Sequence, residues 1–123
     1  MYRYTIPAVP PSNNEYIGRN NRWRYQEIKK RWALLVAAYC HPRPPAPLER
    51  SKVLVTYYFP DKRRRDPDNY APKMILDGMV RCGIILDDSF RNIDLSLCAE
   101  FGSKGAKTEI IVEEINANDL QPL

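Results

Sequence analysis

The stretch that decides the fold runs from Lys52 to Phe59 and reads KVLVTYYF. Its β-branched and aromatic residues favour a strand, and because both faces are apolar we expect a central strand of a sheet. Pro60 ends this strand, since proline cannot donate to a strand ladder. Just before it, residues 41–50 hold the prolines Pro42, Pro44, Pro45 and Pro47, which predict an extended surface loop rather than a domain boundary.

Helical periodicity is found on both sides of this strand. From Arg22 to Tyr39, apolar side chains fall on one stripe of a helix: Ile28, Trp32, Leu35, Val36 and Tyr39. A second helix is predicted to begin near Asp68 to Tyr70, after the acidic, proline-containing cap Asp66-Pro67-Asp68, and to end at Arg81 before Gly83. Pro72 would then lie in its first turn. The side chains expected to be buried are Met74, Ile75, Gly78, Met79 and Cys82.

Three further strands complete the expected sheet. Tyr2 to Ile6 predicts a short strand, and Arg91 to Phe101 alternates apolar and polar residues as a half-buried strand does. We expect residues 102–105 to form a hairpin turn to a partner strand from Lys107 to Ile115. The order β-α-β-α-β-β predicts a single α+β domain over residues 1–123, with two helices packed on a mixed sheet. The polar residues 116–123 are expected to fray.

Composition limits the class of protein. Hydrophobic residues make up 44% and charged residues 28%, which fits a globular chain and excludes a disordered one. No apolar run is long enough to span a bilayer, and no signal peptide precedes the first strand, so a cytoplasmic location is expected. Cys40, Cys82 and Cys98 lack Cys-x-x-Cys spacing, with His41 the one histidine. We therefore expect reduced, largely buried thiols rather than a zinc site.

The charge pattern indicates an anionic partner. The formal net charge is +4 and the pI about 9.0, and the uninterrupted basic run Lys62, Arg63, Arg64 and Arg65 suits contacts with a phosphate backbone. Arg22 and Arg24 form part of a second, looser basic cluster. Beside them, Trp23 and Tyr25 suit either stacking on exposed bases or core packing, whereas Trp32 is expected in the core.

Acidic residues flank the second predicted helix. Asp66 and Asp68 lie at its start, and Asp87-Asp88 follow after the chain returns. Carboxylates gathered at one point repel one another unless a cation neutralises them, and hard oxygen ligands suit Mg²⁺ or Mn²⁺. The alternative is that these residues only cap a helix and form a turn. The basic run directly beside Asp66 favours a metal site acting on a phosphodiester, with Lys73 stabilising charge and Asp77, four residues on, orienting it.

Several segments together resemble the RusA family of Holliday-junction resolvases. They are RDPDN at residues 65–69, Lys73, LDGM at 76–79, GIILDD at 83–88 and PPSNN at 10–14. The resemblance implies a Mg²⁺-dependent endodeoxyribonuclease, able to use Mn²⁺, that makes paired symmetric nicks across four-way branched DNA in recombination and repair, at the nucleoid. It implies that Asp66, Asp68 and Asp88 hold the metal and act in catalysis with Lys73, and that Asp87 is a fourth ligand or lies behind the ligands. Asn13, Asn14 and Lys104 would join the basic residues on DNA.

The interval from Asn69 to Lys73 is one residue longer than in the family pattern, which bears on the placement of Lys73. Two symmetric nicks from a chain with one candidate site imply a homodimer, formed through a strand edge or through the Trp32 helix. No organic cofactor is expected. Two alternatives remain: a non-catalytic branched-DNA-binding protein, which shares the basic surface, and a small interaction domain whose acidic cluster is a helix cap.

Overall fold

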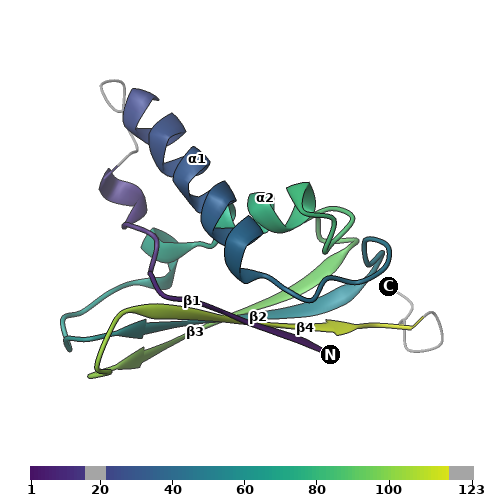
Figure 1. Cartoon of the computed structure of the whole chain (residues 1–123). Helices are drawn as coiled ribbons and strands as arrows, with labels where there is room; N and C mark the ends of the chain where they lie inside the picture. Colours follow the sequence, from purple (N-terminus) through teal and green to yellow (C-terminus); the bar gives the residue numbers. More distant parts are fainter. Residues whose placement is uncertain (16–21, 117–123) are drawn as a thin grey trace.

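The computed structural model describes residues 1–15 and 22–116. Its strands are β1 (Tyr2–Ile6), β2 (Ser51–Phe59), β3 (Ile93–Phe101) and β4 (Lys107–Glu114), its α-helices are α1 (Arg22–Tyr39) and α2 (Lys73–Arg81), and its short 3-10 helices are η1 (Asn13–Glu15) and η3 (Pro67–Tyr70). Both α-helices lie on the same face of the sheet (Figure 1). The predicted α+β fold, with two helices on a mixed sheet, is confirmed. Within the described residues, no helix is both long and apolar enough to cross a bilayer.

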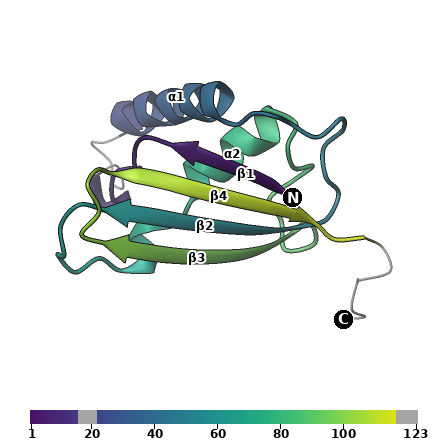
Figure 2. The same ribbon diagram turned by 60° about the horizontal axis from the view of Figure 1, so that its bottom comes forward.

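The four strands are ordered β1-β4-β2-β3, as Figure 2 shows. β2 lies inside the sheet, parallel to β3 and antiparallel to β4, which confirms the central strand. The expected hairpin between β3 and β4 is wrong, because β4 pairs with β2 and β1 instead. β2 is the most continuously apolar strand and gains most from a neighbour on each side. The 102–106 turn therefore crosses the end of β2, where the Ser103 amide donates to the Phe59 carbonyl at 3.2 Å.

The core lies between the sheet and the helices. Alternate residues of β1, β2 and β4 point toward the helices and are buried, as are Ile28, Trp32, Val36 and Cys40 of the α1 region. These four recur every fourth residue, and each step turns the buried face by about 40°. By the end of α1 that face belongs to Cys40, so Tyr39 is 46% exposed, and its predicted place on the buried stripe is wrong.

α1 and α2 approach each other closely at Gly78. A Cβ built there would lie 2.9 Å from the Cβ of Val36, closer than real side chains pack. Met74, Ile75, Gly78 and Met79 are buried as expected, while Cys82 is half-buried. Gly83, with φ +76°, ends the helix in a left-handed conformation, which confirms its predicted role. The position of α2 above the sheet is therefore fixed by a contact that only glycine permits.

The predicted start of the second helix is wrong. Residues 66–81 form two pieces, the 3-10 helix η3 and the α-helix α2. Ala71 between them is extended, with φ −52° and ψ 132°, because a residue before proline avoids the helical conformation. Pro72 then becomes the N-cap of α2. Asp66 and Asp68 consequently lie on a separate turn that precedes the helix.

β3 is less covered than its alternating sequence predicts. Ile93 is buried and Leu97 half-buried, but Leu95 is 43% exposed and Ala99 is also exposed. β3 is the outermost strand next to β2, on the side of the sheet away from α1 (Figure 2), so its apolar face receives little cover from the helices. Cys98 on this strand is exposed as well, which corrects the expectation of largely buried thiols.

Candidate nucleic-acid interface and acidic site

The first acidic segment, Asp66 to Asp68, follows the end of β2 and is held from two sides. The Asn13 side-chain amide donates to the Asp68 carbonyl at 3.1 Å across 55 positions of sequence. From the sheet, the Tyr57 hydroxyl donates to the Tyr70 carbonyl at 2.7 Å. Asp66 is the N-cap of η3, but its side chain makes no capping hydrogen bond. Its carboxylate is therefore available for a role other than helix capping.

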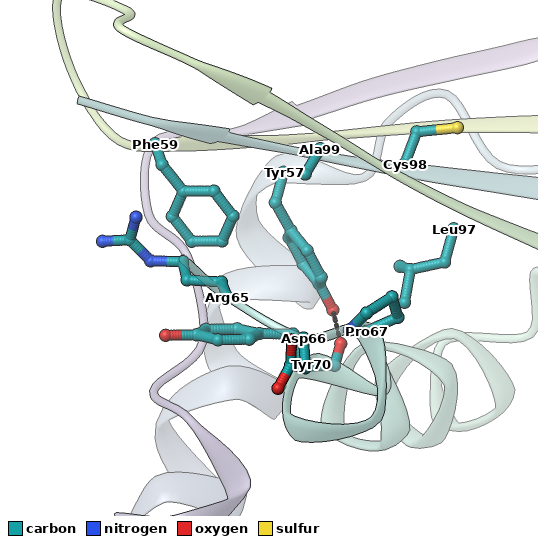
Figure 3. A pocket seen from close by; sticks show the side chains of 9 residues that line it. All are labelled: Tyr57, Phe59, Arg65, Asp66, Pro67, Tyr70, Leu97, Cys98 and Ala99. Atoms are coloured by element: carbon teal, nitrogen blue, oxygen red, sulfur yellow. Dashed lines mark hydrogen bonds between the residues drawn. The ribbon is translucent and has the colours of Figure 1, made fainter. Parts of the chain in front are cut away.

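An aromatic pocket lies directly beside this segment. Phe59 packs edge-on against Tyr70, with ring centroids 5.2 Å apart, and Tyr57 lies 6.0 Å from each of them. Figure 3 shows the Asp66 carboxylate on the side of Tyr70 away from Phe59. The pocket is lined by Tyr57, Phe59, Arg65, Asp66, Pro67, Tyr70, Leu97, Cys98 and Ala99. The aromatic cluster thus anchors the acidic turn to the end of the sheet.

The basic run divides into a structural and an exposed part. The Arg65 guanidinium grips both Asp61 oxygens, at 2.8 and 3.2 Å, and lies 4.1 Å from the Phe59 ring centroid. This hydrogen bond from Arg65, together with one from the Arg63 amide, holds the pKa of Asp61 well below its usual range. Only 12% of the Arg65 side chain is exposed, against 80% for Arg63 and 88% for Arg64. Sequence reasoning missed Asp61, although its position four residues before Arg65 was a visible signal.

The exposed cations gather at one end of the sheet. Lys62, Arg63 and Arg64 leave β2 there, and a Cβ built on Gly102 would lie 3.6 Å from the Lys62 side chain, which places the 102–106 turn, with the exposed Lys104, beside them. The Arg64 side chain also donates to Asp66 at 3.3 Å. The predicted basic surface therefore adjoins the first acidic segment directly.

The N-terminal candidates lie in different surroundings. Arg22 and Asn14 are exposed, whereas Arg24 pairs with Glu15 at 3.3 Å. Trp23 is 67% exposed, so its ring remains free of the core. Tyr25 is half-buried against the core, and Trp32 is 2% exposed within it, as predicted. The base-stacking interpretation is thus favoured for Trp23 rather than for Tyr25.

The second acidic segment, Asp87-Asp88, follows α2, and both residues are exposed. The Asp87 carboxylate accepts a hydrogen bond from the Asp88 amide at 2.9 Å. Figures 1 and 2 both place η3 and the 83–92 connection at opposite ends of α2. Across residues 1–15 and 22–116, no group of three or more His, Cys, Asp or Glu side chains is arranged to hold a metal. A single chain therefore brings Asp66 and Asp68 into one turn and leaves Asp88 apart from them.

The chemistry of the donors nevertheless suits a hard cation. Each segment offers carboxylate oxygens at the surface, and Mg²⁺ commonly binds one or two carboxylates plus substrate phosphates. Lys73, the first residue of α2, is exposed near the first segment. The expected ion pair between Lys73 and Asp77 is absent from those that the described residues form. Lys73 thus carries an available charge.

This combination of exposed cations beside surface carboxylates, on a small α+β fold, is typical of a protein that acts on a nucleic-acid backbone. Comparison with known proteins narrows the class. The crossover junction endodeoxyribonuclease RusA of Escherichia coli K12 is 31% identical over 126 aligned positions, covering 93% of this chain and 95% of that protein. The RusA protein of Enterobacteria phage 82 is 29% identical over the same shares. No protein-family model matches the chain. The chain belongs to the RusA family of crossover junction endodeoxyribonucleases.

Proposed function

We propose that this protein is a structure-specific endodeoxyribonuclease that resolves four-way DNA junctions by paired, symmetric nicks. The observation that carries the proposal is the similarity to RusA endonucleases along 93% of the chain. It is supported by the exposed cations Lys62, Arg63, Arg64 and Lys104 next to Asp66, since such a surface suits a phosphodiester backbone. Arg65 has a structural role instead, because its contacts with Asp61 and Phe59 fix the path of the chain into the acidic turn.

We further propose that the reaction depends on Mg²⁺, which Mn²⁺ can replace, held by Asp66, Asp68 and Asp88. The ion would lower the pKa of a bound water and neutralise charge on the phosphate. In the protein, Asn13 holds the backbone of Asp68, and Lys73 offers a compact positive charge to the phosphate. The Asp87 carboxylate accepts a hydrogen bond from the Asp88 amide and so orients Asp88.

A homodimer provides two such sites, one for each nick. Two surfaces suit self-association: the outer edge of β3, where Leu95 and Phe101 are each 43% exposed, and the outer face of α1, where Leu34 is 72% exposed. Within the part of the chain that the structure describes, the outer edge of β3 also has no neighbouring strand to pair with its backbone groups, so we favour it as the interface. Because both acidic segments are fixed at opposite ends of α2, we propose that Asp88 of the partner subunit completes each metal site.

The test is cleavage of an end-labelled four-way junction, compared with a linear duplex of the same sequence. We expect symmetric nicks in the junction in Mg²⁺ and none in EDTA. Asp66→Asn should abolish nicking but keep junction binding, because it removes a ligand and a negative charge near phosphates. Glu113→Gln removes an exposed carboxylate on β4 instead and should cut normally. Undiminished nicking by Asp66→Asn in Mg²⁺ would refute the metal site.

The same assay separates the proposal from a non-catalytic branched-DNA-binding protein. That protein would bind the junction with or without EDTA and cut it in neither Mg²⁺ nor Mn²⁺. In both cases log K should fall linearly with log salt if the exposed cations contact phosphates. The third possibility, an interaction domain whose acidic residues serve as a cap, is disfavoured because the Asp66 side chain caps nothing.

A further inference from the structure

Phe90 is the most exposed of the large apolar side chains in the described residues, at 98%. An aromatic ring left wholly in water forgoes the stabilisation that burial would give. Truncating it should therefore cost the isolated fold almost nothing. The exposed ring of Phe90 is therefore better explained by contact with another molecule than by a role in folding.

The backbone that carries Phe90 is firmly held. The Arg50 guanidinium donates to the carbonyls of both Phe90 and Arg91, and it is itself paired with Asp94 at 2.9 Å. On the other side, the Asn92 side-chain amide donates to the Glu49 carbonyl at 2.9 Å and the Ser89 hydroxyl donates to the Asn92 side-chain oxygen at 2.6 Å. Backbone amides of residues 92 and 93 both donate to the Ser89 carbonyl. Phe90 is thus displayed on a rigid tight turn.

The surroundings of Phe90 suit DNA better than an apolar protein surface. Asp88 lies two residues before it and the exposed Arg91 directly after it, while the exposed Leu86 is separated from it by the acidic pair. Protein interfaces bury a contiguous apolar centre that is poor in charge. A single ring between a candidate metal ligand and a cation instead resembles the apolar wedges that proteins insert between base steps, with phosphates on either side.

We propose that Phe90 is such a wedge: it inserts between bases at the branch point of the junction and stacks on one of them. This inference rests on the proposed function and assigns the residue that distorts the substrate beside the acidic site. The branch point is a favourable place for insertion, because stacking is already interrupted there. The turn 88–92 then couples the opened base step to Asp88, two residues away.

The experiment compares Phe90→Ala and Phe90→Trp with Tyr39→Ala, which truncates another exposed aromatic residue, at the end of α1. Binding is followed in EDTA by the fluorescence of 2-aminopurine placed at the branch point, which rises when the base is unstacked. We expect a rise with the wild type, with Phe90→Trp and with Tyr39→Ala, and none with Phe90→Ala. In Mg²⁺, Phe90→Ala should cut a fully paired junction about 10-fold more slowly. It should recover most of that rate on a junction with unpaired bases at the branch.

The outcomes are separable. If the wild type cuts no junction, the proposed function fails, and the fluorescence experiment still judges the wedge. If Phe90→Ala raises the fluorescence and cuts the paired junction as the wild type does, the wedge is refuted. It is also refuted if Phe90→Ala shifts the protein from dimer to monomer in light scattering and recovers its activity at high concentration, because Phe90 would then contact a second protein chain. Unchanged melting temperatures of the variants exclude a folding defect.

Discussion

The two acidic segments that flank α2 are built in opposite ways. The first, Asp66 to Asp68, lies against an aromatic cluster and beside four exposed cations. Asn13 holds the backbone of this segment, and Tyr57 holds the backbone of the nearby Tyr70. The second, Asp87-Asp88, precedes a turn that Arg50 holds by hydrogen bonds, and this turn carries the exposed ring of Phe90. One segment thus suits gripping a phosphate backbone, and the other suits disturbing the bases.

Both segments are nevertheless fixed by partners that are distant in sequence. Asn13 lies 55 positions from Asp68, and Arg50 lies 40 from Phe90. Between them stands α2, whose nine residues span about 13 Å. Neither end can move toward the other without breaking these hydrogen bonds. This rigidity is why we propose that two chains, rather than one, complete the acidic trio.

The largest expected effect tests that difference. Asp66→Asn and Asp88→Asn homodimers should each lose at least about 100-fold in nicking rate, because each variant lacks a metal ligand. Mixed dimers of the two variants hold one intact site if Asp88 acts on its partner's Asp66 and Asp68, and should then nick one strand of each junction. Differently tagged chains, co-expressed and doubly purified, provide the sample for a nicking gel. Mixed dimers as inactive as the parents would place Asp88 in the site of its own chain.

The next effect concerns the helix that separates the segments. Gly78→Ala places a methyl group 2.9 Å from Val36 and should destabilise the fold by about 1–3 kcal/mol, since a packed core tolerates overfilling poorly. Gly105→Ala is the matched control, because a Cβ there meets nothing within 4 Å. Urea unfolding followed by tryptophan fluorescence measures both. Equal stability of the two variants would show that α1 can move away from α2 at little cost.

Periodicity predicted most of the elements, because burial of one face is a local property of a strand or helix. It succeeded for β1, α1 and β2 within a residue or so at each end. It failed where burial depends on distant neighbours: β4 pairs across the sheet with β2 and β1, and the apolar face of β3 lies beyond the helices. Pro72 indicated a break after η3, but the acidic residues before it suggested a helix N-terminus, so the predicted helix began several residues too early.

The candidate site was predictable as residue types and less so as geometry. The acidic and basic residues were identified from spacing and from the family resemblance, but their partners were not. The pairing of Arg65 with Asp61 and the bond from Asn13 to Asp68 depend on how the chain leaves β2 and where η1 packs. Nothing local marked Phe90 as exposed, since its ring lies next to a strand of alternating apolar residues.

Intermediate effects are expected from the side chains that hold each segment. Asn13→Ala frees the Asp68 backbone and should raise the Mg²⁺ concentration for half-maximal nicking about 10-fold, as loss of a group behind a metal ligand commonly does. Asn92→Ala loosens the turn after Asp88 and should do the same if Asp88 binds the ion. Magnesium titrations of the nicking rate measure both. A change in rate for Asn92→Ala with an unaltered magnesium requirement would remove Asp88 from the ligand set.

The smallest expected effect lies in the ion pair between Arg65 and Asp61, which precedes the first segment. Arg65 lowers the pKa of Asp61 in the folded state. Asp61 therefore contributes stability above pH 4, the ordinary range of a free aspartate, and this contribution is lost as the pH falls further toward the depressed pKa. Asp61→Asn should melt slightly below the wild type at pH 7. The difference should shrink in acid, and also in high salt, because 46% of the Asp61 side chain is exposed. Among the described residues, neither Asp87 nor Asp88 forms such an ion pair, so Asp87→Asn should show no comparable loss. A difference between Asp61→Asn and wild type that persists unchanged at pH 2 would mean that packing around Arg65 and Phe59, rather than the charge of Asp61, holds the acidic turn in place.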